Sequence, residues 1–363
     1  MTVYHDLSEV SLPASVLTIG SFDGLHLGHQ ALIRSLVEEG RAERLPSAVV
    51  TFYPHPSVVL RARRPAFYIT LPEEKTARLS ALGVDHVVTQ RFDEALSRVS
   101  AGEFLDRLEA RLHFQQLWIG EDFALGHERE GNRLFLRREA ERRGFSLHEV
   151  PPAKVGGEVV SSTRVREALR AGDVARVATY LGRPFVLRGP VVRGAARGKA
   201  LGIPTANIAL HPEQAYPAQG VYACWAELPE GRRQAVTNVG MRPTFDEELP
   251  SPVVEAHIFD WDGDLYDQPI GLAFVARLRE EQRFPGKAAL VEQIHRDIQQ
   301  TRDLLGSGME DDHPLRDAKR DPLQDPLRDA KRDTKRDPLR DPLRDAKRDP
   351  LRDAKRDAKR DVT

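Results

Sequence analysis

The chain has 363 residues, enough for two compact domains, and its 54 basic and 55 acidic side chains give a formal net charge of -1. A charge so near zero supplies no overall field that would draw the protein to nucleic acid or to an acidic membrane. The single cysteine, Cys224, excludes an internal disulfide and a zinc site built from several cysteines. The start has no basic segment followed by an apolar one, and no run approaches the roughly 18 apolar residues of a membrane helix. We therefore expect a soluble, cytoplasmic protein that binds neither nucleic acid nor membrane.

Short apolar or β-branched runs alternate with helix patterns through the first half of the chain. The runs predict strands over residues 15–20, 47–53, 84–89, 115–120 and 146–151. Between them, Thr70 is a predicted helix N-cap with Pro72 in the first turn, and Ser100 has capping-box spacing to Glu103. The alternation predicts an α/β domain with a doubly wound parallel sheet, whose ligands gather at the carboxyl ends of the strands.

The composition changes near Gly182. Short strand-like segments such as "GVYACWAEL" and "VVEAHIFD" follow, separated by turn residues, and an apolar periodicity predicts a closing helix over residues 287–305. This pattern is typical of a small antiparallel β-barrel. We therefore predict an N-terminal domain over 1–182, a C-terminal domain over 183–305 and a tail over 306–363.

The tail consists of units reading "PLRD" or "AKRD", with an aspartate at every fourth position from Asp317 to Asp361. Its prolines interrupt any continuous helix, and it has too few apolar residues to form a core. We predict a disordered, charge-balanced extension; a weak electrostatic interaction arm is the alternative.

The stretch "IGSFDGLHLGHQALI" (residues 19–33) lies where a predicted strand gives way to a helix near Gly28. A glycine loop followed by a helix N-terminus presents free N–H groups, which suits a phosphate. His26 and His29, three residues apart, face the same way in a first helical turn and could donate hydrogen bonds to phosphate oxygens. The plainer alternative is a glycine turn with two incidental histidines.

The pattern Gly-x-Phe-Asp-Gly-x-His-x-Gly-His resembles the nucleotidyltransferase superfamily, and in this longer form the FMN adenylyltransferase module of bacterial bifunctional riboflavin kinase/FAD synthetases. The resemblance implies catalytic roles for His26 and His29 and a doubly wound nucleotidyltransferase fold. It also implies that ATP is bound by Gly20, Phe22, Asp23, Gly24 and Gly28.

Two further regions extend this resemblance. "SSTRVREAL" (161–169) is similar to the family's Ser-Ser-Thr-x-x-Arg segment, in which Ser161 or Ser162 would cap a helix. The residues implied to bind the departing phosphates are Ser162, Thr163, Arg164 and Arg166. In two loops that follow strands, His55 and Asp122 are the implied contacts to the FMN phosphate and the nucleotide. A capped amphipathic helix and two ordinary loops are the alternatives. Many relatives have Gly-Asp where this chain has Gly131 and Asn132.

The second glycine-rich stretch, "GPVVRGAARGKALGIPTANI" (189–208), is not a Walker A loop, because its spacing is too short and Ala200 replaces the Ser or Thr. It resembles the riboflavin kinase signature, in which Pro-Thr-x-Asn binds Mg²⁺. The resemblance implies that Thr205 and Asn207 are the Mg²⁺ ligands, with the metal bound together with ATP. Gly194, Gly198 and Gly202 would then belong to the loop that covers ATP; a plain barrel hairpin is the alternative.

Downstream, Glu255 matches the family's glutamate that takes the proton from the riboflavin 5′-hydroxyl. "RLREEQRF" (277–284) resembles a segment near the flavin, which implies ring contacts for Arg279 and Phe284. An exposed strand glutamate and an amphipathic strand end are the alternatives.

The resemblance spans roughly residues 10 to 305. It implies a two-step enzyme that phosphorylates riboflavin with ATP to FMN and then adenylylates FMN with a second ATP to FAD, releasing pyrophosphate. Riboflavin, FMN and ATP are its expected partners, and the sequence leaves a homo-oligomer open. Two rival interpretations are a chain in which only the kinase is active, and a flavin-binding or nucleic-acid-binding protein whose tail is the functional part.

Overall fold

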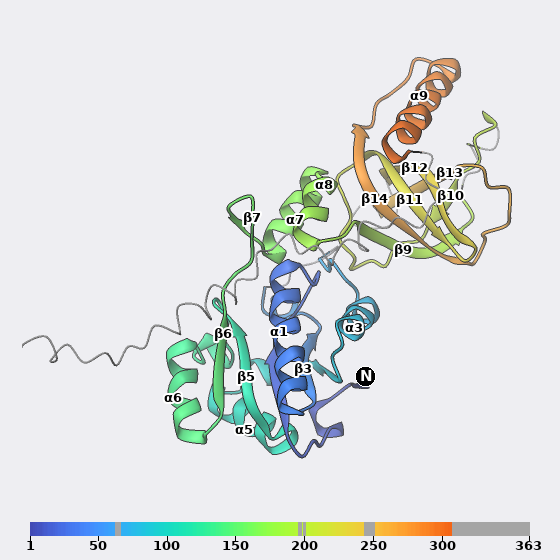
Figure 1. Ribbon diagram of the computed structural model, residues 1–363. Helices are drawn as coiled ribbons and strands as arrows, with labels where there is room; N and C mark the ends of the chain where they lie inside the picture. Colours follow the sequence, from blue (N-terminus) through green and yellow to red (C-terminus); the bar gives the residue numbers. More distant parts are fainter. Residues whose placement is uncertain (62–66, 195–197, 199–200, 243–250, 307–363) are drawn as a thin grey trace, which may run out of the picture. The chain divides into compact units, whose positions relative to one another are not determined.

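We describe a computed structural model of the chain, which covers residues 1–61, 67–194, 198, 201–242 and 251–306. The predicted tail apart from Gly306, and parts of the predicted ATP-covering loop, lie outside these residues. The fold consists of a parallel sheet with flanking helices followed by a closed barrel (Figure 1).

The N-terminal sheet has six parallel strands in the order β1-β4-β3-β2-β5-β6. The strands are β1 (Thr2–Tyr4), β2 (Ser15–Ile19), β3 (Ser47–Tyr53), β4 (His86–Arg91), β5 (Phe114–Gly120) and β6 (Ser146–Val150). The helices are α1 (Leu27–Glu43), α2 (Pro56–Arg61), α3 (Pro72–Ala81), α4 (Glu94–Ser97), α5 (Ala101–Leu112) and α6 (Arg133–Arg143), with short 3-10 turns η1 (Leu7–Glu9) and η2 (His127–Arg129). The doubly wound parallel sheet is confirmed, although β1 was not predicted.

Two separate cores cover the two faces of this sheet. On one face, Val16, Val49 and Val87 pack against α1 and α3. On the other, Leu17 and Val50 pack against α5 and α6. Successive residues of a strand point to opposite faces, so strands buried on both sides read as continuous apolar runs, as they do here.

A short hairpin and two helices follow the sheet. They are β7 (Lys154–Val155), β8 (Glu158–Val159), α7 (Ser162–Ala171) and α8 (Val174–Leu181). Asp173 caps α8 through a hydrogen bond from the Arg176 amide, and Gly182 ends the helix at φ 67°, where glycine carries no steric penalty.

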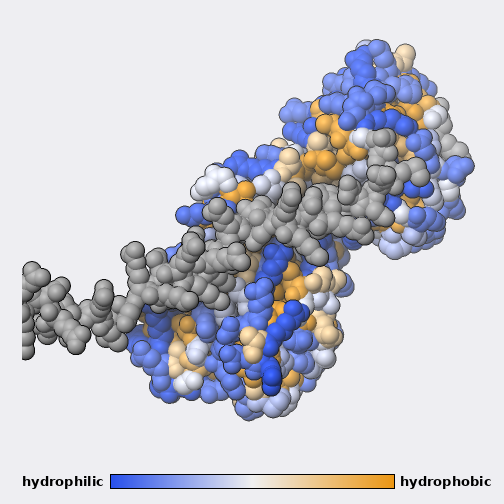
Figure 2. Space-filling view, in the orientation of Figure 1, coloured by the Kyte–Doolittle hydropathy of each residue, from blue (hydrophilic) through white to orange (hydrophobic). Residues whose placement is uncertain are grey.

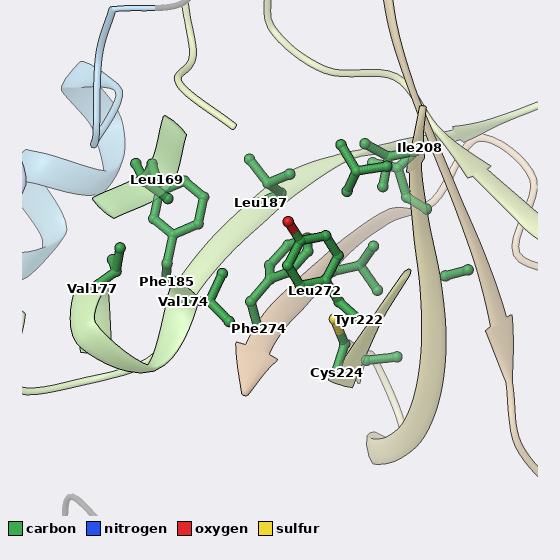
Figure 3. Close-up of a cluster of buried hydrophobic side chains, with 14 of the residues drawn as sticks. Leu169, Val174, Val177, Phe185, Leu187, Ile208, Tyr222, Cys224, Leu272 and Phe274 are labelled. Carbon is green, nitrogen blue, oxygen red and sulfur yellow. The ribbon is translucent and has the colours of Figure 1, made fainter. Parts of the chain in front are cut away.

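The barrel closes in the order β10-β13-β12-β11-β14-β9 with every pairing antiparallel, so the predicted barrel is confirmed. Its strands are β9 (Phe185–Val192), β10 (Ala206–Ile208), β11 (Gly220–Leu228), β12 (Gly231–Arg242), β13 (Ser251–Ile258) and β14 (Pro269–Arg279), and the closing helix is α9 (Lys287–Leu305). Tyr222, Cys224, Leu272 and Phe274 fill the interior, and residues of α7 and α8 belong to the same core (Figure 3). Cys224 is a buried free thiol that packs as a small apolar side chain.

Hydrophilic residues cover most of the visible surface of the described part, with smaller apolar areas between them (Figure 2). Among the described residues, no helix is both long enough and apolar enough to span a bilayer.

Candidate active sites

The first candidate site lies at the carboxyl end of β2, the strand between β3 and β5. In a doubly wound sheet this is the switch point, where loops leave towards opposite faces and open a crevice. Because every strand is parallel, the loops after β3 and β5, which contain His55 and Asp122, begin at the same edge as the histidine loop, as predicted.

His26 and His29 form a stacked pair at the start of α1. His26 is the N-cap residue, and its Nδ1 accepts a hydrogen bond of 3.3 Å from the His29 amide. The ring centroids lie 3.7 Å apart, and Phe22 packs edge-on against His29 at 5.2 Å. The first helical amides, on Leu27 and Gly28, have no acceptor within the helix, so they remain available to an anion.

Burial keeps both imidazoles neutral at pH 7. It lowers the pKa of His26 to about 4, and together with the neighbouring His26 it lowers the pKa of His29 well below its ordinary value. Because Nδ1 of His26 accepts the backbone hydrogen bond, the single proton of the neutral ring belongs on Nε2. His26 is therefore a neutral hydrogen-bond donor at a helix N-terminus, which suits a phosphate oxygen.

The loop before the histidines has a strained backbone that Asp23 holds in place. Phe22 and Leu25 have φ of 47° and 43°, a region that side chains other than glycine rarely adopt. Asp23 is 2% exposed; its carboxylate accepts hydrogen bonds from the amides of Ile69 (3.2 Å) and Thr70 (3.0 Å). Asp23 also forms a buried ion pair with Arg166. Its carboxylate is thus occupied by protein groups.

The predicted N-cap role of Thr70 is wrong. The N-cap position of α3 is Leu71, which makes no side-chain cap. The Thr70 hydroxyl instead accepts a hydrogen bond of 3.0 Å from the amide of Gly24. The Thr70 hydroxyl bonds to Gly24 and not to the first amides of α3, because it is buried against the loop after β2, where the Gly24 N–H would otherwise have no acceptor.

The 161–169 segment lies beside this loop. Ser161 is the residue that caps α7, and the Ser162 hydroxyl donates to the carbonyl of Asp23 at 2.8 Å. Thr163 is exposed, and Arg164 forms an ion pair with Glu158 at 3.0 Å. The guanidinium of Arg166 donates to the carbonyl of Phe67 at 2.9 Å and stacks over its ring at 3.8 Å.

The two loop candidates differ in their surroundings. His55 is half-buried; its Nδ1 accepts from the Ser57 amide at 3.0 Å, and its ring packs against Phe67. Asp122 is exposed and lines a pocket of about 540 Å³. Asn132 caps α6 by accepting from two backbone amides, which an aspartate at this position could equally do.

The second candidate site lies on the outer face of the barrel. On β13, Val254 and Ala256 point into the core, so Glu255 points outward. Glu255 is the register partner of Asn207 on β10 and of Asn238 on β12. Directly opposite residues have Cβ atoms about 5 Å apart, so one carboxylate lies between two amides.

A pocket of about 780 Å³ separates this face from α9 and takes in Thr205, Glu255 and Phe284. Leu290 and Ile294 of α9 line the pocket as well, so α9 supplies an apolar wall opposite the polar side chain of Glu255. Gly198 also lines the pocket, whereas Gly202, at φ 74°, belongs to the turn that leads towards β10.

Arg279 lines this pocket and also anchors α9. Its guanidinium makes a forked ion pair with Asp297, with hydrogen bonds of 2.8 to 3.1 Å, and Asp297 is 2% exposed. The ring of Phe284 lies 5.7 Å from the same guanidinium. Arg279 therefore holds one wall of the pocket in place.

The side-chain oxygen atoms of Thr205 and Asn207 are of the kind that bind a hard cation. A Cβ on Gly194 would lie 2.2 to 2.5 Å from the Asn207 amide group, so only glycine permits this approach. The described residues contain no group of three His, Cys, Asp or Glu side chains that could hold a metal. A cation bound here would rely on Thr205, Asn207 and the phosphates of a nucleotide, a donor set that fits Mg²⁺.

Sequence reasoning missed several polar residues at these sites. Lys75 is buried beneath the first loop, Asn238 lies beside Glu255, and Asp297 holds Arg279. The burial of Lys75 could have been predicted from the sequence, because Lys75 precedes Leu79 by four residues and so lies on the apolar side of α3. Asn238 and Asp297 lie on different elements from their partners Glu255 and Arg279, so local spacing gave no sign of either contact.

Comparisons with known proteins identify a family for each half of the described chain. A family model described as FAD synthetase matches residues 9–164, and one described as riboflavin kinase matches residues 181–305. The bifunctional riboflavin kinase/FMN adenylyltransferase of Escherichia coli K12 is 37% identical over 304 residues, which cover 83% of this chain and 96% of the relative. The Bacillus subtilis protein of the same name is 34% identical over 299 residues, covering 82% of this chain and 94% of the relative.

Among solved structures, a crystal structure described as a macrolide-efflux protein from Streptococcus pneumoniae aligns with a TM-score of 0.76 at 30% identity, covering 83% of this chain and 98% of that one. The fold thus recurs nearly complete in a known structure. With two family models in the order that the two sites require, the chain belongs to the bifunctional riboflavin kinase/FMN adenylyltransferase family.

Proposed function

We propose that the outer face of the barrel phosphorylates riboflavin. Glu255 takes the proton from the 5′-hydroxyl, Thr205 and Asn207 hold Mg²⁺-ATP, and Leu290 and Ile294 pack against the flavin ring. Bound Mg²⁺ would neutralise charge on the γ-phosphate. The observation that carries this assignment is the register that puts Glu255 directly opposite Asn207, at the rim of the 780 Å³ pocket.

For the second step, the stacked neutral histidines support adenylyl transfer at the carboxyl end of β2. The FMN phosphate attacks the α-phosphorus of ATP; it is already ionised at neutral pH, so no strong base is required. His26 donates from Nε2 to phosphate oxygen, while the amides at the start of α1 add fixed donors. Thr163 and Arg164 lie at the start of α7, where they could bind the departing pyrophosphate.

Asp23 and Arg166 act as positioning residues in this proposal. Both are buried and paired, so they hold the loop before the histidines instead of touching the phosphates. We keep the division into domains 1–182 and 183–305 as a division of the chain, because Gly182 ends α8 and the barrel strands begin at Phe185; in packing, α7 and α8 share the core of the barrel. ATP and free flavins as substrates favour the cytoplasm.

Replacing His29 with alanine tests the adenylyl-transfer assignment. Wild-type protein given riboflavin, ATP and Mg²⁺ is expected to form FMN and then FAD, whereas His29→Ala should accumulate FMN and lower FAD formation about a hundredfold, because a phosphate donor is lost. Product analysis by chromatography measures both flavins in one sample. Wild-type FAD formation by His29→Ala would contradict the assignment.

Removing residues 311–363 tests the rival in which the repeats are the functional part. We expect both activities of the truncated chain to stay within about twofold of wild type, since the site residues assigned above all lie between residues 20 and 297 and the repeats have too few apolar residues to form a core. Initial rates of FMN and FAD formation decide this. A large loss of either rate would show that the tail takes part in catalysis.

A further inference from the structure

Lys75 lies buried on α3, directly beneath the first site. Only 4% of its surface is exposed. Its Nζ donates three hydrogen bonds: to the carbonyl of Ser21 (3.1 Å), to the hydroxyl of Thr51 (2.9 Å) and to the carbonyl of Phe52 (3.4 Å). One ammonium group thereby ties the loop that follows β2 to the end of β3.

All three acceptors of Lys75 are neutral. Among the ion pairs of the described residues none includes Lys75, and the neighbouring carboxylate of Asp23 is engaged by Arg166. Burying a charge without a paired carboxylate lowers stability. The three hydrogen bonds explain why a donor is buried here, and an anion bound above it would explain why that donor carries a charge.

We propose that Lys75 is a positioning residue of the adenylyl-transfer site. It fixes Ser21 and the end of β3, and it supplies the positive potential under the loop that receives the triphosphate of ATP. The charge acts without solvent screening because the group is buried. This inference rests on the assignment of the His26 and His29 loop to adenylyl transfer.

The protonation of Lys75 makes the proposal testable by pH. Burial lowers its pKa to about 8, while Asp23 opposes the shift. The other titratable group that interacts with it is the neutral His29. As pH rises through 8, Lys75 loses its charge, so kcat/KM for ATP should fall, because this ratio reports the free enzyme.

The experiment measures kcat/KM for ATP in the conversion of FMN to FAD between pH 6 and pH 9.5. The variants are Lys75→Met, Lys75→Arg and the exposed control Lys154→Met. We expect Lys75→Met to lower the ratio about a hundredfold at pH 7 and to abolish the fall near pH 8. Lys75→Arg should keep at least about a tenth of the ratio and lose the fall near pH 8, because arginine stays protonated.

Riboflavin phosphorylation in the same samples controls for the amount of folded chain. A wild-type ratio that stays flat through pH 9 would overturn the proposal, as would a fall near pH 8 that persists in Lys75→Met, or a Lys75→Met ratio within about threefold of wild type. If Lys75→Met does not fold, the wild-type and Lys75→Arg profiles decide alone. His29→Ala distinguishes failure of the adenylyl-transfer assignment from failure of the Lys75 proposal. Normal FAD formation by His29→Ala would reject the assignment of the site. Loss of FAD formation in His29→Ala, together with an unaffected Lys75→Met, would reject only the role of Lys75.

Discussion

Glu255→Gln is expected to lower the rate of riboflavin phosphorylation about a thousandfold, while FMN supplied directly is still converted to FAD at the wild-type rate. Glutamine keeps the size of the side chain but cannot take the hydroxyl proton, and positioned general bases contribute roughly two to four orders of magnitude. Asn207→Ala should give the same split, with a raised requirement for Mg²⁺. Initial rates with riboflavin as substrate measure phosphorylation, and initial rates with FMN as substrate measure adenylylation.

Glu230→Gln is the matched control, since Glu230 is exposed near the β11–β12 turn. It should leave both rates unchanged. Retention of more than about a tenth of the phosphorylation rate by Glu255→Gln would reject Glu255 as the base. Loss of FMN adenylylation in the same variant would show that the two reactions do not use separate residues.

Arg166→Met is expected to lower the free energy of unfolding of the N-terminal domain by about 3–5 kcal/mol. The substitution leaves the Asp23 carboxylate buried with amide donors but without its cation, and breaking one side of a buried pair is costly. Trp118 reports on this domain once Trp225 and Trp261 are replaced by phenylalanine, because the chain has three tryptophans. Urea denaturation followed by its fluorescence gives the difference.

Arg176→Met is the control, because the ion pair of Arg176 with Glu158 is half-exposed and water screens the attraction between the two charges. Adding Asp23→Asn to Arg166→Met should recover part of the loss but not all of it, since a neutral amide accepts less well from Ile69 and Thr70 than a carboxylate does. A loss below about 1 kcal/mol in Arg166→Met would show that the pair does not hold the loop.

The contrast between Thr70 and Ser100 shows where local reasoning succeeds. Ser100 and Glu103 form the predicted capping box at the exposed start of α5, where their nearest partners are neighbours in the chain. Thr70 has the same kind of hydroxyl next to a helix, but it is buried against the loop after β2 and bonds to Gly24. Capping rules hold where no distant group competes for the hydroxyl.

The glycine stretches were recognisable because turns, helix starts and strand periodicity depend on residues close in the chain. The sequence alone therefore placed their loops at strand ends, and its alternating pattern indicated a parallel sheet followed by a barrel. The start of α1 at Leu27, next to the predicted Gly28, and the position of Glu255 on a strand follow from the same local rules.

The tertiary structure alone decided which polar groups meet. Three such contacts join different elements of the fold. Asp23 pairs with Arg166, and Lys75 bonds to the loop after β2 and to the end of β3. Glu255 lies between Asn207 and Asn238. Strand order and register bring these residues together. Both are determined by burying the two faces of the sheet and by closing the barrel, and neither can be predicted from a short stretch of sequence.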